Sequence, residues 1–596
     1  MVGHDRSALR DARRGFGDRA SCVVAAILAT HALLLAWIDY RNSPTIDEVA
    51  HLPAGISHLL LARFDLYRVN PPLVRSVAAI PVVVAGAKTD WSSYSIAPGN
   101  RAEFAVGEAF VKANGAKVFW YFTLARWACI PFSLVGGYFC YRWARWLYGP
   151  APGVVAAALW SFSPNILGNA AMITPDAGAA AFGVMCGYCF HRWLADPRWL
   201  RAFTTGAALG LAALAKTTWI VLFPLLPALW LVWALVNRRT RTRRGRSSEA
   251  RQLSAALLTA IYLINLGYGF EGSFRRLGDF KFVGRLFAGP GEQVPYGNRF
   301  AGSWLGYLVV PLPSSYLEGI DIQKSDFERG KVSFLRGEQR LGGWWHYYLY
   351  ALAIKVPTGA LVLALLAAGL TARRGFSAGA MNEAVVIAPA IVVLLIVSSQ
   401  TGFSRHFRYL LPAIPFAFVS VSKIARAVAL GHRSLGLVSA ACLCWSMASG
   451  MAVYPHCLSY FNELVGGPTR GRSHLVDANV DWGQDLLYLA HWAEAHPAAV
   501  PLYVSYFGTV DPKLAGIEAM PLRHEATAPE TPFATAKIAD PLKPGWYAVS
   551  VNHLGAYRHW QASGNPDDSQ FLRLMPVSRA GYSICIYRVQ PHATRP

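Results

Sequence analysis

The stretch CVVAAILATHALLLAWI, residues 22–38, is the first of many long apolar blocks and decides how the chain is interpreted. It follows a basic N-terminal segment that contains Arg6, Arg10, Arg13, Arg14 and Arg19. No small-residue cleavage site ends it, which favours a retained membrane-spanning helix over a cleaved signal peptide. We therefore expect residues 1–19 to be cytoplasmic and the chain to leave this helix on the external side.

The composition extends this conclusion to the whole chain. Of 596 residues, 54% are hydrophobic and only 15% are charged, whereas soluble domains have about 25% charged residues. The 20 Trp, 26 Tyr and 30 Phe exclude a disordered chain. Each apolar block is long enough to cross a bilayer core of about 30 Å, so we predict a polytopic α-helical membrane protein with about eleven spans.

The remaining spans and the charge distribution agree with each other. After the first helix, we predict helices near residues 118–141, 151–170, 177–194, 201–217, 219–236, 252–270, 348–371, 383–399, 409–424 and 434–453. The net charge of +22 is then a topology signal, because cytoplasmic loops retain Lys and Arg. Alternation puts every strongly basic short loop inside except residues 404–408. No soluble basic domain is present, so we expect no nucleic-acid partner.

The predicted spans divide the chain into three parts. The cytoplasmic N-terminus, residues 1–19, precedes a transmembrane domain, residues 20–453, with external loops 39–117 and 271–347. The first loop contains the stretch Leu73 to Ala87, expected to form a juxtamembrane or shallow helix. Residues 454–596 are soluble in composition and predict a small external α/β domain, with a helix at 485–496 and strands at 502–507, 546–551 and 582–589.

Two further patterns lie in the predicted external domain. Cys457 and Cys585 lie outside the apolar blocks, and the sequence leaves open whether they pair. The segment from Asp477 to Asp485 has oxygen-bearing side chains at alternate positions, as a calcium loop has. However, Trp482 stands where such a loop needs glycine, and Tyr488 stands where it needs a bidentate Glu. A turn that caps the following helix is the favoured interpretation.

An acidic pair follows the first helix. Asp47 and Glu48 lie in the sequence TIDEVAH, residues 45–51, and the sequence NPPL follows at residues 70–73. Two adjacent carboxylates beside an apolar surface repel each other and lose water, so we expect at least one to have a raised pKa and to accept a proton. The same residues also suit a plain helix start, where acids favour the positive end of the helix.

These residues resemble the first external loop of the GT-C glycosyltransferases, closest to the protein O-mannosyltransferase and aminoarabinose transferase group. Asn70 departs from the His or Lys that usually precedes Pro-Pro-Leu in that group. Over residues 20–455 the resemblance continues in Ala125-Arg126, Ser163 to Asp176, Leu214 to Lys216, Ile354 to Pro357 and Arg408 to Pro412. It implies a polyprenyl-phosphate sugar donor and inverting transfer outside the cytoplasmic membrane or in the ER lumen.

The resemblance and the chemistry together assign roles. A leaving phosphate gains charge in the transition state, and cations stabilise it. The cations expected to do so are Arg126, Lys216, Lys355, Arg405 and Arg408, which would explain the outward basic loop. Snorkelling to lipid headgroups is the alternative. We expect Asp47 to act as general base, with Glu48 and Asp176 orienting the acceptor or the sugar. Substrate contacts are expected from His51, Asn70, Trp345 and Tyr347, of which the last two also suit an aromatic belt.

The expected partners are a polyprenyl-phosphate-linked sugar, an acceptor protein, lipid or glycan, and membrane lipids. No nucleotide-binding loop is found, and the carboxylates leave dependence on a divalent cation open. A bacterial cytoplasmic membrane with an external, periplasmic active site is the expected location. The rival functions are a flippase for lipid-linked sugars and a lipid-linked glycan polymerase or ligase. A flippase would need charged groups at the bilayer midplane, whereas these acids lie in external loops.

Overall fold

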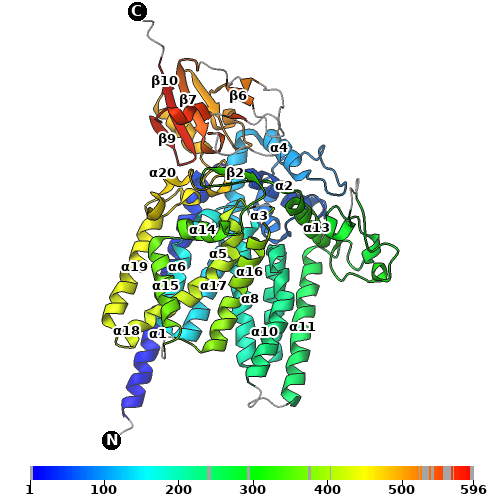
Figure 1. The fold of residues 1–596 in the computed structure, drawn as a ribbon, viewed down its shortest axis with the longest axis vertical. Coiled ribbons are helices and arrows are strands. Elements are labelled where there is room, and N and C mark those ends of the chain that lie inside the picture. The colour runs from blue at the N-terminus through cyan, green and yellow to red at the C-terminus, as the bar shows by residue number, and fades with distance from the viewer. Residues whose placement is uncertain are drawn as a thin grey trace, which may run out of the picture.

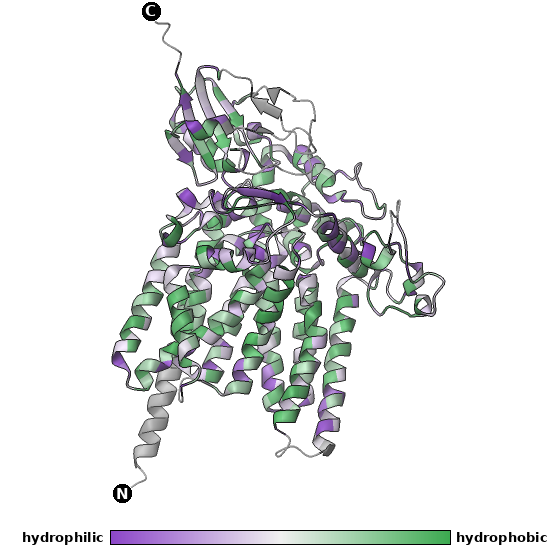
Figure 2. Ribbon diagram, in the orientation of Figure 1, coloured by the Kyte–Doolittle hydropathy of each residue, from purple (hydrophilic) through white to green (hydrophobic). Residues whose placement is uncertain are grey.

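The computed structural model describes residues 4–237, 243–290, 296–373, 377–402, 404–521, 524–525, 536–538, 542–554, 566–567 and 569–590. Residues 238–242 of the predicted basic loop from Arg238 to Arg251, and Arg374 of another, lie outside the described residues. A bundle of apolar helices forms one end of the molecule, and the C-terminal sheet lies at the opposite end (Figure 1). Figure 2 shows that hydrophobic residues dominate the bundle.

The bundle consists of the predicted membrane helices and of one four-residue helix, α18, from the predicted cytoplasmic loop 423–433. They are α1 (His4–Arg41), α5 (Val118–Tyr148), α6 (Pro150–Ser161), α7 (Pro164–Ala170), α8 (Pro175–Ala195), α9 (Trp199–Ala215), α10 (Leu222–Val236), α11 (Arg243–Gly267), α15 (Thr358–Leu370), α16 (Ala380–Ser399), α17 (Ile414–Val421), α18 (Arg426–Ala429) and α19 (Arg433–Met451). Two 3-10 helices, η2 (Thr217–Val221) and η5 (Phe407–Ala413), lead into α10 and α17. The predicted polytopic helical fold is confirmed.

A count by helix length and composition gives fewer spans than the sequence predicted. Among the described residues, six helices are long and apolar enough to cross a membrane, or up to eight if each of two bent helix pairs counts as one span. The prediction of about eleven also counted α6 and α9, which have 12 and 17 residues. It counted α11 as well, although this helix begins with charged residues.

The two bent pairs place predicted site residues at chain reversals. Helices α7 and α8 meet at 118°, and Pro175 begins α8 immediately before Asp176. Helices α14 (Tyr347–Lys355) and α15 meet at 114°, with Pro357 between them. Proline starts a helix readily but disfavours helical geometry in the residue before it, so each bend follows from the sequence.

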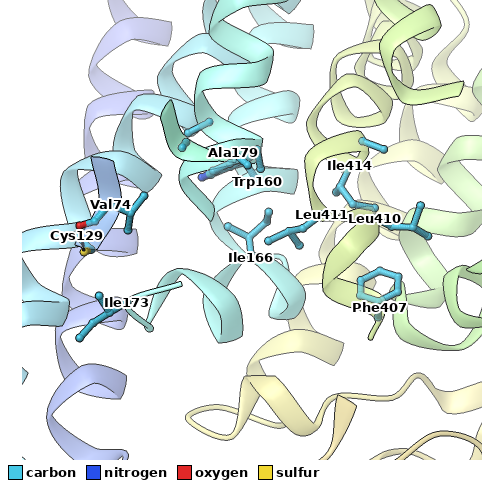
Figure 3. Packing of buried hydrophobic residues seen from close by; sticks show 14 of the residues in the cluster. Val74, Cys129, Trp160, Ile166, Ile173, Ala179, Phe407, Leu410, Leu411 and Ile414 are labelled. Carbon is cyan, nitrogen blue, oxygen red and sulfur yellow. Dashed lines mark hydrogen bonds between the residues drawn. The ribbon is translucent and has the colours of Figure 1, made fainter. Parts of the chain in front are cut away.

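Small residues bring the bundle helices close together. A Cβ atom at Gly183 of α8 would lie 2.1 Å from the ring of Trp219. One at Gly359 of α15 would lie 2.2 Å from the backbone oxygen of Cys442 in α19. Close approach through small residues is the usual way in which helices pack in membranes. Figure 3 shows the apolar interior that results, with Ile166 and Leu411 pointing toward each other between α7 and η5.

Short helices form a layer at the end of the bundle that faces the sheet (Figure 1). They are α2 (Ile46–Leu60), α3 (Leu73–Val84), α4 (Glu103–Asn114), α13 (Ser314–Arg329), α14 and α20 (Pro468–Gly471), with α12 (Arg285–Ala288) in the same external region. Helix α3 is the predicted shallow helix at Leu73 to Ala87. The predicted loop 39–117 also contains α2, whose start was one of the two interpretations of the acidic pair, and α4, which was not predicted. The loop 271–347 contains the hairpin β1 (Val332–Leu335) and β2 (Glu338–Leu341), which was not predicted either. Helix α18 lies at the opposite end.

The C-terminal region is a small α/β unit, as predicted. Helix α21 (Leu486–Ala495) accompanies a mixed sheet of order β4-β3-β7-β10-β9. Its strands are β3 (Leu502–Ser505), β4 (Met520–Pro521), β7 (Gly545–Ser550), β9 (Ser578–Ala580) and β10 (Ile584–Val589). A smaller sheet joins β5 (His524–Glu525), β6 (Ala536–Ile538) and β8 (Pro566–Asp567).

All nine cysteines lie in the described residues and are free, so Cys457 and Cys585 do not pair.

Candidate functional site

A cavity of about 360 Å³ lies where the bundle, the layer of short helices and the C-terminal region meet. Its lining comes mainly from α2, α4, α8, α13, the first turn of η5 with the residues before it, and the C-terminal region. Seven residues that the sequence predicted line it, namely Asp47, His51, Asn70, Asp176, Lys216, Arg405 and Arg408. They come from positions up to 361 residues apart in the chain. The fold therefore assembles one polar site from scattered motifs.

Arg408 is at the centre of this site. Its Nη2 lies 3.0 Å from Oδ2 of Asp47, and its Nη1 lies 3.6 Å from Oδ2 of Asp176. The side chains of Arg408 and Asp47 are 11% and 21% exposed, so Asp47 remains accessible from the cavity. One guanidinium group thus bridges two carboxylates that the sequence places on different external loops.

Lys216 provides a second cation beside Asp176. Its Nζ lies 2.5 Å from Oδ1 of Asp176. Helix α9 ends at Ala215, and Lys216 has extended backbone angles, which turns its side chain away from the helix and toward the first turn of α8. Both side chains are almost fully buried, so little water screens the pair. Lys216 and Arg408 together form a positive site around Asp176.

A second charged group occupies another wall of the cavity. Arg405 Nη2 lies 2.8 Å from Oδ2 of Asp477, and burial lowers the pKa of Arg405 although Asp477 opposes the shift. Lys331 lies 4.0 Å from Asp326. Burial lowers the pKa of Lys331 to about 8, although Asp326 acts in the opposite direction. A lysine of this kind loses its charge at mildly alkaline pH.

His51 enters the cavity as a neutral ring. It stacks on Tyr67 with ring centroids 4.5 Å apart, and its buried Nε2 has no hydrogen-bond partner among the described residues. Burial holds the pKa of His51 well below its usual range, and the nearby guanidinium groups of Arg75, Arg408 and Arg101 lower it further. A neutral imidazole with one unused nitrogen is able to accept or donate a hydrogen bond to a bound substrate.

Glu48 does not face the cavity, unlike its neighbour Asp47. It is fully buried, and its carboxylate accepts hydrogen bonds from Arg126 at 2.8 and 2.6 Å. The backbone N–H groups of Thr45 and Ile173 add bonds of 2.9 and 3.0 Å. Burial alone would raise the pKa of Glu48, but the charge of Arg126 and these hydrogen bonds outweigh it and hold the pKa below its usual range. The raised pKa that was predicted for at least one member of the acidic pair is therefore not found at Glu48.

The other four predicted site residues do not line the cavity. Arg126 pairs with Glu48 and donates to the backbone oxygens of residues 39, 42 and 43. Lys355 is buried and donates to the backbone oxygens of Leu458 and Asn479 at 3.0 and 2.8 Å. Tyr347 is buried and donates to the oxygen of Arg405 at 2.6 Å. Trp345 is 66% exposed and does not line the cavity.

An apolar groove of about 240 Å³ adjoins the cavity. The two share Lys216, Gln323, Phe327 and Tyr409. The rest of the groove is lined mainly by residues of η2 and α16, among them Ile220, Val221, Ile396 and Val397. These helices belong to candidate membrane spans. The groove therefore leads from the apolar bundle to the positive site at Lys216.

The described residues contain no group of three or more His, Cys, Asp or Glu side chains placed to hold a metal ion. The carboxylates of Asp47, Asp176 and Asp477 each have a cationic neighbour instead.

Sequence reasoning missed part of the cavity wall. The structure adds Arg101, Asp326, Lys331, Asp477 and Trp482. The first three lie in segments without a recognised motif. Asp477 and Trp482 belong to the segment that the sequence singled out, but Trp482 served there only to exclude a calcium loop. The signal in the sequence that could have identified this wall was the occurrence of three aspartates and a tryptophan within nine residues.

Comparison with known proteins bears on this site. The sequence profile of the dolichyl-phosphate-mannose-protein mannosyltransferase family matches residues 119–264. This segment is similar in sequence to the members of that family. The match contains Arg126, Asp176 and Lys216, and it confirms the resemblance that the motifs indicated. A search of curated proteins finds no match.

Two solved structures show a likeness over most of the chain. ArnT from Cupriavidus metallidurans, bound to undecaprenyl phosphate, is 11% identical with a TM-score of 0.42, and the alignment covers 94% of this chain and 97% of that one. The archaeal oligosaccharyltransferase AglB from Archaeoglobus fulgidus, in complex with an inhibitory peptide and a dolichol-phosphate, is 11% identical with a TM-score of 0.40. That alignment covers 72% of this chain and 56% of AglB.

Proposed function

We propose that this integral membrane protein is an inverting glycosyltransferase that moves a sugar from a polyprenyl-phosphate donor to an acceptor hydroxyl. The observation that carries the proposal is the bridge from Arg408 to Asp47 and Asp176, with Lys216 beside it, at the end of an apolar groove. A lipid phosphate needs an apolar channel for its tail and cations for its headgroup, and this place provides both. The match to a mannosyltransferase family over residues 119–264 supports the same chemistry.

In this proposal the donor lies along the groove. Its isoprenoid tail follows the apolar residues of η2 and α16, and its phosphate reaches Lys216 and Arg408, where groove and cavity meet. The sugar then extends into the cavity past Asp176. Because the site is largely buried, each cation stabilises the phosphate more than it would in water.

The reaction needs a proton acceptor and a stabilised leaving group. The oxygen of the acceptor hydroxyl attacks the anomeric carbon of the sugar from the face opposite the phosphate, and Asp47 takes the hydroxyl proton. The bond from the anomeric carbon to the phosphate oxygen breaks, and the phosphate leaves with the electron pair. Lys216 and Arg408 hold the charge that it gains. Asp176 orients the sugar, and the neutral ring of His51 offers a hydrogen bond.

Donor binding and base activity are linked in this arrangement. Without the donor, the carboxylate of Asp47 is engaged by Arg408 at 3.0 Å. A phosphate oxygen that binds Arg408 competes with Asp47 for the guanidinium. The carboxylate is then less strongly neutralised and accepts a proton more readily.

The proposed location is a bacterial cytoplasmic membrane with this cavity on the external face.

A transfer assay tests the proposal. Membranes that contain the protein are incubated with labelled polyprenyl-phosphate sugars and candidate acceptors, and covalent products are counted for the wild type, Asp47→Asn and Asp196→Asn. Asp196 is 42% exposed at the end of α8 and provides a matched control. We expect product from the wild type and the control but not from Asp47→Asn. Movement of sugar-lipid across vesicles without a covalent product would instead support a flippase.

A further inference from the structure

The segment from Asp477 to Asp485, called here the bridging segment, has no part in the reaction described above. We infer that Trp482 in this segment is a positioning residue that holds Arg408 in place for the donor phosphate. The inference rests on the proposed function, because it specifies how one of the phosphate-binding cations is oriented. It also gives the C-terminal region a direct role in transfer.

The bridging segment contacts the chain that carries Asp47. The backbone N–H of Ile46, next to Asp47, donates to the oxygen of Trp482 at 3.2 Å. Ser43 donates its N–H to the oxygen of Gln484 at 3.0 Å and its hydroxyl to the oxygen of Gly483 at 2.7 Å. Residues more than 430 positions apart are thus joined by hydrogen bonds on one side of the cavity.

The same segment also contacts the chain that carries Arg408. Asn479 accepts a hydrogen bond from the N–H of Phe407 at 2.9 Å and donates to the oxygen of Arg405 at 2.7 Å. Asp477 forms the ion pair with Arg405. Nine consecutive residues therefore fix the backbone on both sides of the Asp47 to Arg408 contact.

The indole ring of Trp482 completes the arrangement. It is 2% exposed and lines the cavity, and the guanidinium carbon of Arg408 lies 4.0 Å from its centroid. Its neighbour Gly483 has a φ of +89°, and a Cβ atom there would lie 2.8 Å from the Cα of Gly508. Only glycine suits that backbone, which sets the direction of Trp482. A cation on the face of a buried indole is a favourable contact, and it is stronger here than it would be in water.

The chemistry of the step explains why an uncharged contact is useful. The carboxylates of Asp47 and Asp176 hold Arg408 only until the phosphate competes for the guanidinium. The face of Trp482 does not compete with an anion for the guanidinium, since an aromatic face carries no oxygen or nitrogen acceptor that would occupy its N–H groups in place of the phosphate. Trp482 therefore keeps Arg408 in position both before and after the donor binds.

A double-mutant cycle tests this role. The dissociation constant for undecaprenyl phosphate is measured on the full chain in lipid nanodiscs for the wild type, Trp482→Leu, Arg408→Ala and the double variant. We expect Trp482→Leu to weaken binding roughly tenfold or more, and Trp482→Phe, which keeps an aromatic face, to weaken it less. In the Arg408→Ala background, Trp482→Leu should have no further effect. Trp199→Leu replaces an exposed tryptophan of α9 and should bind as the wild type does.

Additive effects of the two substitutions would overturn the inference, as would equal binding by Trp482→Leu and the wild type. If the leucine variant does not purify as a folded protein, the same cycle with Trp482→Phe gives the answer, and additivity there is equally decisive. The proposed function fails separately, when the wild type binds the lipid phosphate but forms no transfer product. In that case a non-additive cycle still establishes Trp482 as the residue that positions Arg408.

Discussion

Replacing Glu48 by Gln should destabilise the fold rather than disable the chemistry. The side chain is fully buried, and its two oxygens receive hydrogen bonds from Arg126, Thr45 and Ile173. An amide at this position points an N–H group at donors and leaves the guanidinium of Arg126, 1% exposed, without its counter-charge. Removal of one partner of a buried ion pair costs about 3 to 5 kcal/mol.

The measurement is unfolding of the purified protein in detergent, followed by circular dichroism and by loss of the monodisperse peak after heating. Glu48→Gln should unfold at a clearly lower temperature than the wild type. The control Glu494→Gln, whose side chain is 74% exposed, should not differ from it. Unchanged unfolding together with a slower transfer reaction would refute this reasoning and return Glu48 to the catalytic role that the sequence suggested.

Four further predictions concern the cavity and the bundle. Asp47→Asn should lower the transfer rate by about 10² to 10⁴, the usual contribution of a general base, while binding of undecaprenyl phosphate stays equal or tightens. Burial lowers the pKa of Lys331 to about 8, so its positive charge is present below that pH and lost above it. Donor affinity should therefore fall as the pH rises from 7 to 9, and Lys331→Arg should abolish this fall. The measurement is the KM for the donor, determined for both proteins at several pH values between 7 and 9. Gly359→Leu should lower the unfolding temperature, because a Cβ there meets the backbone of α19 at 2.2 Å, whereas full stability would contradict the packing described. Trp345→Ala should retain wild-type transfer, and a large loss in the same assay would place this tryptophan at the substrate.

The helical fold was accessible from sequence because apolar blocks and basic loops are dictated by the bilayer. The predicted helix at residues 118–141 corresponds to α5, and the predicted helix at 383–399 corresponds to α16. The bend between α14 and α15 was not expected, because residues 348–371 were predicted as one helix, although Pro357 lies between the two. The hydropathy of a segment does not indicate whether its helix crosses straight or turns back, since both forms bury the same residues.

The acidic pair shows where sequence reasoning about the site ended. Successive residues of a helix point about 100° apart, so Asp47 and Glu48 at the start of α2 have different surroundings despite their adjacency. Glu48 is buried against Arg126, and Asp47 lines the cavity. Which of two neighbouring acids faces inward depends on the partner that each finds, here at position 126 or 408. The C-terminal contribution of Trp482 depends on contacts that span the chain in the same way.

The most direct measurement follows both products of the reaction with purified protein in lipid nanodiscs. A polyprenyl-phosphate sugar labelled separately in the sugar and in the phosphate is supplied with an acceptor, and the two labels are traced by mass spectrometry. We predict that labelled sugar on the acceptor and free polyprenyl phosphate appear in equal amounts, and that neither forms with Arg408→Ala. Donor that stays intact in the presence of wild-type protein with each class of acceptor, whether protein, lipid or glycan, would contradict the account.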